Sequence, residues 1–170
     1  MTAKREVDPA VASRPVAAPE ELGERLVGTP VAWLTTVRPD GAPHLVPVWY
    51  LWVDGGFVVF SKPAAVKVKN VVADGRVMLA LGQPEDDFDV QLVEGDARLL
   101  PVSTPSVLPA LAAELQAKYA GWMAAIGLTL AEFAETYRSV IRIEPTRFLG
   151  WRGRTGGRDL GLANHALNAA

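Results

Sequence analysis

The sequence predicts a mainly β protein with inserted helices, closed into a small antiparallel barrel. About six β-rich runs are bounded by turn residues. Helical patterns interrupt them at only a few places, without the strand-helix alternation that a parallel sheet requires. Because an open sheet exposes unpaired edges, six such strands favour a closed barrel.

Length and composition limit the protein class. The chain has 170 residues, of which 49% are hydrophobic and 21% charged, which suits one globular domain with its own core. The net charge of -2 provides no field for a polyanion, so we expect no nucleic-acid partner. Since the chain has no cysteine and only two histidines, disulfides and thiolate catalysis are excluded and we expect no metal site.

The two ends of the chain differ from its centre. We expect residues 1–18 to form a flexible N-terminal arm, residues 19–152 to form the barrel domain and residues 153–170 to form a C-terminal tail. The arm lacks the apolar core of a signal peptide, and the chain has no run of 18 apolar residues. The expectation is a soluble cytoplasmic protein with no membrane partner.

The first half of the chain should begin with a short helix and continue as a meander. Pro19 suits a first helical turn, and Gly28 can end that helix. Strands are expected at 31–37, 44–53 and 57–61, joined by a Pro-Asp-Gly turn and by an Asp-Gly-Gly turn. A helix from Pro63 or Ala64 to Ala73 follows, because its apolar residues recur every three or four positions.

The second half should contain three strands and a helical insert at about 104–137. We expect strands at 76–81 and 88–100, separated by an acidic loop at 83–89, with Gly95 as a bulge. The insert begins at Thr104, is interrupted at Gly121 and Gly127, and ends with a capping-box helix over 129–137. The last strand covers 139–144, and Pro145 should end it.

A lysine-rich corner is the best candidate for an anion site. Ser61 and Lys62 lie where a strand passes into the predicted helix, whose first N-H groups and dipole favour an anion. Lys67 and Asn70 lie three apart on one helical face, whereas Lys69 points about 200° away from Lys67. The alternative is that these lysines only solubilise a surface helix.

The strand around Pro47 is the second candidate. Proline inside a strand marks an edge, a bulge or a place where the backbone meets a flat ligand. Trp49 and Trp52 point to opposite faces, so only one can face the barrel interior. The alternative is that both are core or dimer-interface aromatics, an interpretation favoured for Trp52 and evenly balanced for Trp49.

Other polar residues are assigned structural roles. His44 is expected in a turn or surface hydrogen bond, and the Thr35-Thr36 pair on the sheet surface. The cluster of Arg147, Trp151 and Arg152 suits a surface patch, a dimer contact or a second anion contact. No Ser-His-Asp order, glutamate pair in a motif, Walker loop or zinc signature is present, so no catalytic residue is assigned.

Several segments taken in order resemble the pyridoxamine 5'-phosphate oxidase-like split-barrel proteins, and within them the flavin/deazaflavin oxidoreductase group, B branch. The matching segments are Ala32 to Thr36, Asp40 to Trp49, Phe60-Ser61, Lys67 to Val71 and Asp74 to Leu79. The resemblance covers about residues 20–152. The Arg-x-His motif of the true pyridoxamine phosphate oxidases is absent from residues 147–153, so vitamin B6 oxidation is not expected.

The resemblance implies a Greek-key split barrel that forms a homodimer with cofactor clefts at the interface. It implies that the strand from Val46 through Pro47 and Val48 to Trp49 lies along a tricyclic ring. Ser61, Lys62 and Lys67 would meet the cofactor phosphate, and Phe60 and Asn70 complete the expected set of cofactor-binding residues.

The function implied is an oxidoreductase that uses reduced coenzyme F-420, an 8-hydroxy-5-deazaflavin, to transfer hydride to a small conjugated or heteroaromatic acceptor. Such a cofactor supplies the reactivity, while the protein supplies orientation and a dry cleft. One alternative keeps the fold with FMN as cofactor. Another is a protein that sequesters a flavin, a deazaflavin or haem without catalysis.

Overall fold

A computed structural model describes residues 16–82, 90–152 and 163–166. The predicted acidic loop at 83–89 lies outside the described residues, as do residues 1–15 of the predicted arm and most of the predicted tail. Val16, the first described residue, donates its backbone N-H to the carbonyl of Pro145 at 2.9 Å.

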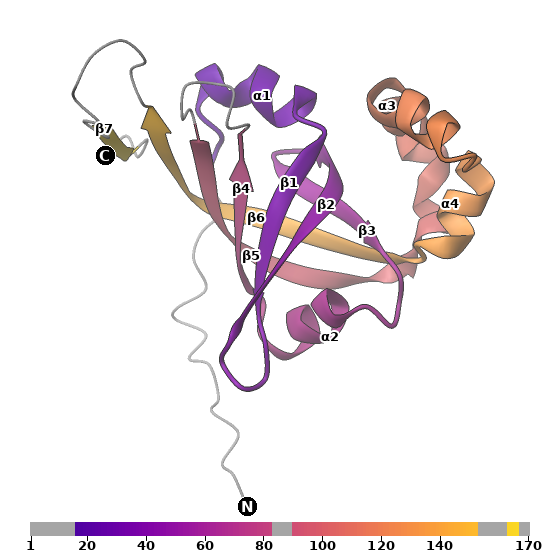
Figure 1. Cartoon of the computed structure of the whole chain (residues 1–170), viewed down its shortest axis with the longest axis horizontal. Coiled ribbons are helices and arrows are strands. Elements are labelled where there is room, and N and C mark those ends of the chain that lie inside the picture. Colours follow the sequence, from indigo (N-terminus) through magenta and orange to yellow (C-terminus); the bar gives the residue numbers. More distant parts are fainter. Residues whose placement is uncertain (1–15, 83–89, 153–162, 167–170) are drawn as a thin grey trace, which may run out of the picture.

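Six antiparallel strands close into a barrel (Figure 1). The sheet order is β3-β2-β1-β4-β5-β6-β7, and β3 also pairs with β6, which closes the ring from β1 to β6. Because β4 returns beside β1 after the β1-β2-β3 meander, the topology is a Greek key, and the predicted barrel is confirmed. The strands are β1 (Val31–Val37), β2 (Pro43–Val53), β3 (Gly56–Ser61), β4 (Arg76–Leu81), β5 (Val90–Ser103), β6 (Ser139–Arg152) and β7 (Ala163–Ala166).

Helices cover the barrel at its ends and on one side. In Figure 1, α1 lies at one end and α2 at the other, while α3 and α4 lie together against the side. Their bounds are η2 (Glu20–Leu22, a 3-10 helix), α1 (Gly23–Gly28), α2 (Val66–Ala73), α3 (Thr104–Ala125) and α4 (Leu130–Thr136). The opening helix matches its prediction, and it buries Leu22 and Leu26 on one face.

Two apolar cores share the barrel wall. Side chains such as Leu34, Tyr50 and Phe57 fill the barrel interior. A second core lies outside the wall, where Phe60 of β3 and Leu51 of β2 meet the buried faces of α3 and α4. Alternate residues of β2 and β3 therefore enter different cores, which explains why all six residues of β3 are buried.

The last barrel strand is longer than predicted, because Pro145 does not end it. Gly95 of β5 pairs with Pro145, but Glu94 pairs with Arg147, so a bulge adds one residue to β6 at this point. The residue left without a ladder partner is Thr146, whereas Pro145 directs its carbonyl to Val16 and not to β5. Because the N-H and C=O of a strand residue point to the same side, the missing N-H of Pro145 is not required by the β5 ladder. The predicted bulge at Gly95 is confirmed, and β7 replaces part of the predicted tail with a strand paired to β6.

Two helix predictions also need correction. Helix α2 begins at Val66 and not at Pro63 or Ala64, since Ala65 is extended and serves as its N-cap. Helix α3 continues through Gly121 and ends at Ala125, shortly before Gly127, whose φ of +66 is well suited to glycine. There the N-H of Leu128 donates to the carbonyl of Met123 at 2.9 Å, which is the longer bond of a Schellman motif.

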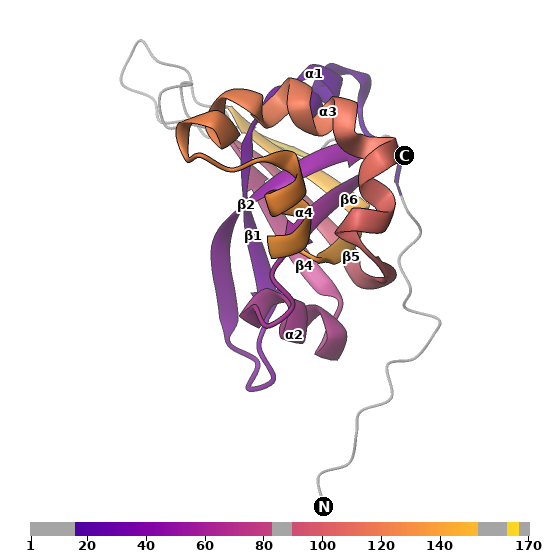
Figure 2. The ribbon, with the colours of Figure 1, turned by 90° about the vertical axis from the view of Figure 1, so that its right-hand side faces the viewer.

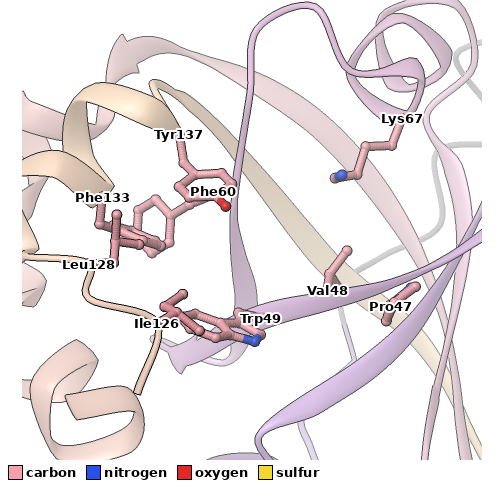
Figure 3. Close-up of a pocket in the computed structure, with 9 residues that line it drawn as sticks. All are labelled: Pro47, Val48, Trp49, Phe60, Lys67, Ile126, Leu128, Phe133 and Tyr137. Carbon is pink, nitrogen blue, oxygen red and sulfur yellow. The ribbon is translucent and has the colours of Figure 1, made fainter. Parts of the chain in front are cut away.

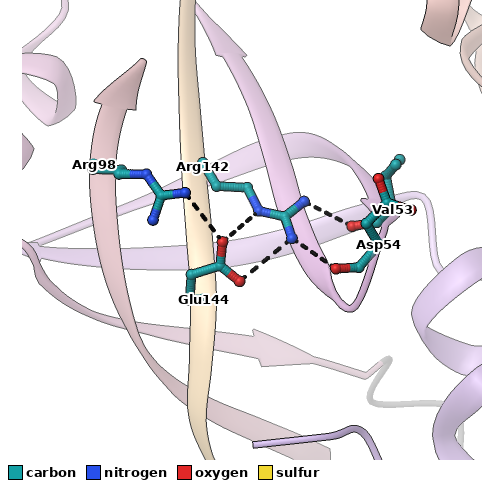
Figure 4. A network of polar contacts seen from close by, with 5 residues as sticks. All are labelled: Val53, Asp54, Arg98, Arg142 and Glu144. Atoms are coloured by element: carbon teal, nitrogen blue, oxygen red, sulfur yellow. Dashed lines mark hydrogen bonds and ion pairs between the residues drawn. The ribbon is translucent and has the colours of Figure 1, made fainter. Parts of the chain in front are cut away.

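A charged network ties the β2-β3 turn to β6 (Figure 4). The Arg142 guanidinium donates to the carbonyls of Val53 at 2.7 Å and Asp54 at 2.8 Å. It also forms an ion pair with Glu144 at 2.8 Å, and Glu144 in turn lies 3.4 Å from Arg98. Arg142 therefore binds two carbonyls at the β2-β3 turn and ties the turn to β6.

Candidate functional site

A cleft of about 220 Å³ lies between the barrel wall and the helical insert (Figure 3). Figure 2 shows α3 and α4 in front of the barrel strands, with α2 below them. Strands β2 and β3 form one side, α2 closes one end, and the α3-α4 corner with α4 forms the other side. The lining residues are Pro47, Val48, Trp49, Phe60, Lys67, Ile126, Leu128, Phe133 and Tyr137.

Five of the nine predicted cofactor-binding residues line this cleft. They come from three separate segments and are Pro47, Val48, Trp49, Phe60 and Lys67. Val46 packs against the barrel core, on the same face of β2 as Val48, which lies two residues along the strand. Ser61, Lys62 and Asn70 are not among the lining residues.

Lys67 is the charged residue of the cleft. Figure 3 shows its ammonium pointing from α2 into the cavity, across from the side bearing Phe60 and Tyr137. Its side chain is half-buried, and desolvation lowers the pKa of the ammonium. Lys69 is exposed, as its helical position predicts. An anion in the cleft would restore to Lys67 the solvation that burial removes.

Trp49 provides a flat wall for the cleft, and it lies outside the barrel. Its ring stacks on Tyr119 of α3 with centroids 4.6 Å apart and planes 4° apart. Trp52 turns to the barrel side and meets Phe57 edge-on at 4.8 Å. The predicted opposition of the two tryptophans is therefore confirmed, and the cleft tryptophan is held rigidly from behind.

Asn70 lies inside the protein and not at the cleft. Its side-chain amide donates to the Thr36 hydroxyl at 2.9 Å, and both residues are at most 1% exposed. The Thr36 hydroxyl can in turn donate to the carbonyl of His44 at 3.4 Å. Thr36 is therefore buried, contrary to the expected surface pair, and Asn70 ties α2 to β1.

The strand-to-helix corner divides between interior and rim. Ser61 is 1% exposed, and its hydroxyl lies 3.4 Å from the carbonyl of Lys62. Lys62 is exposed, and its ammonium lies 5.8 Å from the ring centroid of Tyr137, which lines the cleft. Lys62 is thus at the edge of the cleft, while the Ser61 side chain is turned away from solvent.

Four cleft residues were not predicted, and all come from the helical insert: Ile126, Leu128, Phe133 and Tyr137. Phe133 and Tyr137 lie four apart near the capping-box helix, with ring centroids 5.0 Å apart. Residues four apart share one face of a helix, so this spacing is the signal in the sequence that could have indicated the two rings. Which part of the barrel this helical face covers depends on how the insert folds back.

The ends of the insert are fixed where it leaves the barrel. The Thr104 N-H donates to the carbonyl of Arg138 at 3.0 Å, and the Thr104 hydroxyl donates to the carbonyl of Tyr137. Farther along α3, the Tyr119 hydroxyl accepts from the Tyr50 N-H at 2.9 Å and lies within hydrogen-bond distance of the Tyr50 carbonyl. These contacts hold the helical wall of the cleft against β2.

Arg147 lies away from the cleft and is not among its lining residues. Its side chain is exposed and lies 3.8 Å from the Glu94 carboxylate. Within the described ranges, no three His, Asp or Glu residues gather as metal ligands. None of the helices described there is long and apolar enough to cross a membrane.

The chemistry of the cleft suits a flat, anionic ligand. An indole wall and apolar neighbours favour a planar ring system, and the ammonium of Lys67 favours a negative group at one end. The Tyr137 hydroxyl, which Figure 3 shows on the opposite side, provides a neutral hydrogen-bonding group.

Comparisons with solved structures agree on this fold. A conserved hypothetical protein from Mycobacterium tuberculosis matches at 24% identity and a TM-score of 0.62, over 89% of this chain and 98% of that one. An F-420 reductase matches at 22% identity and a TM-score of 0.59, over 77% and 98%. HutZ, the heme storage protein from Vibrio cholerae, matches at 12% identity and a TM-score of 0.59, over 81% and 98%.

No curated protein matches the sequence. The pyridoxamine 5'-phosphate oxidase family model matches residues 18–152, which is the whole barrel together with its helical insert. The chain therefore belongs to the pyridoxamine 5'-phosphate oxidase family, whose split barrel it has.

Proposed function

We propose that this protein is an oxidoreductase that binds reduced coenzyme F-420 in the cleft and reduces a small conjugated or heteroaromatic acceptor. The observation that carries the proposal is the half-buried ammonium of Lys67 facing a flat wall of Trp49 and Val48 in one cleft. The similarity in fold to an F-420 reductase adds support. FMN is the alternative cofactor, because it too has a planar ring and a phosphate.

The residue types that line the cleft suit such a cofactor. When bound, a deazaflavin supplies hydride transfer from carbon. Trp49, Val48 and Pro47 would lie along the ring, since strand β2 presents them to the cleft. Lys67 would hold the phosphate by a charge-assisted hydrogen bond, with Lys62 adding positive charge at the rim.

The cleft of one chain is too small for the whole cofactor. Pockets for drug-sized ligands span about 300 to 1,000 Å³, whereas this cleft holds about 220 Å³. We therefore propose a homodimer in which a second copy completes the cleft. Exposed apolar side chains such as Trp33 on β1 and Leu45 on β2 offer surface for that contact.

Haem sequestration is the weaker alternative for this chain. The usual axial ligands of haem iron are His, Cys, Met and Tyr side chains. Of these, only Tyr137 is among the cleft residues, and His44 is not. The cleft offers a cation for an anionic group and an indole for a ring, but a single candidate for iron ligation.

The proposal is tested by titrating the purified protein with F-420 and with FMN while following tryptophan fluorescence. Because Trp49 lines the cleft, binding should quench its emission, and F-420 should bind more tightly than FMN. Mixing the reduced cofactor with a set of nitroaromatic and enone acceptors should then give turnover. Binding without oxidation by any acceptor would favour sequestration, and unchanged fluorescence with both cofactors would contradict the proposal.

A further inference from the structure

The hydroxyl of Tyr137 is a polar group of the cleft that the fold does not use. Figure 3 shows it on the side opposite Lys67, and Tyr137 is one of the residues that line the cavity. Hydrogen bonds within the described ranges engage the backbone of Tyr137 but not its hydroxyl. The Tyr119 hydroxyl differs, because it lies 2.7 Å from the carbonyl of Pro30 and accepts from the Tyr50 N-H at 2.9 Å. The hydroxyl of Tyr137 is therefore available to a ligand.

The contacts around Tyr137 fix the position of its ring. Its N-H donates to the carbonyl of Phe133 at 2.9 Å, and its own carbonyl accepts from the Thr104 hydroxyl. The Tyr137 ring lies 5.0 Å from that of Phe133, measured between centroids, and the Lys62 ammonium lies 5.8 Å from the Tyr137 centroid. Because backbone and ring are both held, the hydroxyl loses little freedom when it binds a ligand.

Few side chains of the cleft can supply a proton. Six of the nine lining residues carry no polar side-chain atom. The indole N-H of Trp49 donates hydrogen bonds but does not give up its proton. Lys67 lies on the opposite side and is the proposed phosphate contact. Tyr137 therefore remains as the lining residue that can both bind an oxygen of a ligand and protonate it.

We infer that Tyr137 donates a hydrogen bond to the oxygen of a conjugated carbonyl acceptor and then protonates that oxygen. This inference rests on the proposed function, and it narrows the acceptor to an uncharged conjugated ketone or aldehyde. The side chains of Leu128 and Phe133 line the cleft together with Tyr137, and they suit an acceptor whose body is apolar.

The step balances with the reduced deazaflavin as the source of hydride. The acceptor gains the hydride at its β-carbon, where a carbon-hydrogen bond forms. The electron pair of its carbon-carbon double bond shifts toward the carbonyl, whose oxygen takes the negative charge of an enolate. Tyr137 transfers its hydroxyl proton to that oxygen and later regains a proton from solvent. The resulting enol becomes the saturated ketone, so the acceptor is reduced and the cofactor oxidised by one electron pair.

The first test measures binding without turnover. The full-length protein with oxidised F-420 bound is dialysed to equilibrium against benzylideneacetone, an uncharged conjugated ketone. Parallel samples use phenylbutene, which has the same carbon skeleton without the oxygen. Tyr137→Phe should weaken binding of the ketone about two- to tenfold, the range for one neutral hydrogen bond, and leave binding of phenylbutene unchanged. The infrared carbonyl stretch of the bound ketone should also lie at lower frequency in the wild type than in Tyr137→Phe.

A second variant separates the ring of Tyr137 from its hydroxyl. Tyr137→Leu removes both, so it should weaken binding of the ketone and of phenylbutene alike. Tyr137→Phe keeps the ring, and its binding of F-420 checks that the cleft is intact. With reduced F-420, Tyr137→Phe should lower kcat for the ketone about a hundredfold or more, as expected for loss of a general acid.

The outcomes distinguish this inference from the proposed function. Equal effects of Tyr137→Phe on binding of the ketone and of phenylbutene, or unchanged kcat, would overturn the role of Tyr137 and leave F-420 binding in place. The same holds if the wild type binds F-420 but neither binds nor reduces the ketone. A wild type that does not bind F-420 would contradict the proposed function, and this inference with it.

Discussion

The buried pair of Asn70 and Thr36 shows how a polar residue on a site-bearing helix can serve the fold. Asn70 is on the same helix as Lys67, but its amide points inward to the Thr36 hydroxyl. Both side chains are at most 1% exposed, so neither can exchange its partner for water. The pair fixes α2 against β1 and so fixes where Lys67 enters the cleft.

Replacing Thr36 with Val should destabilise the protein by about 1 to 3 kcal/mol, because the Asn70 amide is left buried without its acceptor. Urea unfolding would measure the loss. Lys69→Ala, at an exposed position of the same helix, should stay within about 0.5 kcal/mol of the wild type. If the stability of Thr36→Val were also within about 0.5 kcal/mol of the wild type, the hydrogen bond between Asn70 and Thr36 would make no net contribution to stability.

At the scale of elements, the capping box of α4 supports one wall of the cleft. The Thr129 hydroxyl accepts from the Glu132 N-H at 3.2 Å, and the Glu132 carboxylate accepts from the Thr129 N-H at 2.9 Å. These bonds satisfy two donors at a helix end that carries Phe133.

Thr129→Ala should destabilise the protein by about 0.5 to 2 kcal/mol through loss of this cap. Because α4 presents Phe133 to the cleft, we also expect weaker cofactor binding. Thermal unfolding and the fluorescence titration measure the two effects. Thr129→Ser retains the hydroxyl and should behave as the wild type, so equal losses in both variants would argue against a capping role.

The β2-β3 turn depends on a glycine because β6 lies so close to it. A Cβ on Gly56 would lie 2.6 Å from Nη2 of Arg142 and 2.7 Å from the backbone oxygen of Ile143. Gly56→Ala should therefore cost about 1 to 3 kcal/mol. Gly23→Ala, where a Cβ meets nothing within 4 Å in helix α1, should instead gain up to about 1 kcal/mol. Urea unfolding of both variants checks the opposite signs.

Local signals in the sequence were sufficient for most elements. Strand β1 has the predicted bounds, and the capping box and the Gly95 bulge occur where expected. Predictions failed where a tertiary contact overrides a local signal. Pro145 lies inside β6 because its backbone groups face Val16 and not the β5 ladder, and no pattern within β6 reveals that pairing.

The cleft was predictable on its strand side and not on its helical side. Trp49 and Lys67 stand out by residue type and by position within an element. Tyr137 and Leu128 enter the cleft only because the Gly127 turn folds α4 back over the barrel. Asn70 shows the reverse error, because its helical spacing agrees with a shared face while its burial excludes it from the cleft.

Across the whole molecule, ion pairs make the protein less stable at acid pH than at neutral pH. The Arg142 guanidinium holds the pKa of Glu144 below its usual range, and that of Arg76 does the same for Asp74. A carboxylate with a lower pKa in the folded state binds protons more readily when unfolded. Its stabilisation is present at neutral pH and is lost as the pH falls below about 4.5.

Glu144→Gln should therefore cost roughly 1.5 kcal/mol at pH 7, as for a weakened hydrogen bond to a charged group. The difference from the wild type should shrink as the pH approaches 3, where Glu144 itself becomes protonated. Urea unfolding at several pH values gives both curves. A gap that stayed constant with pH would show that the charge of Glu144 contributes nothing to stability.

The central claim is that Lys67 holds the phosphate of a cofactor in the cleft, and the dissociation constant of coenzyme F-420 for Lys67→Ala tests it most directly. We predict a loss of about 1.5 to 3 kcal/mol, or roughly ten- to 150-fold weaker binding, the range for a charge-assisted hydrogen bond. Lys69→Ala, two residues along the same helix, should bind as the wild type does. An unchanged dissociation constant for Lys67→Ala would contradict the account.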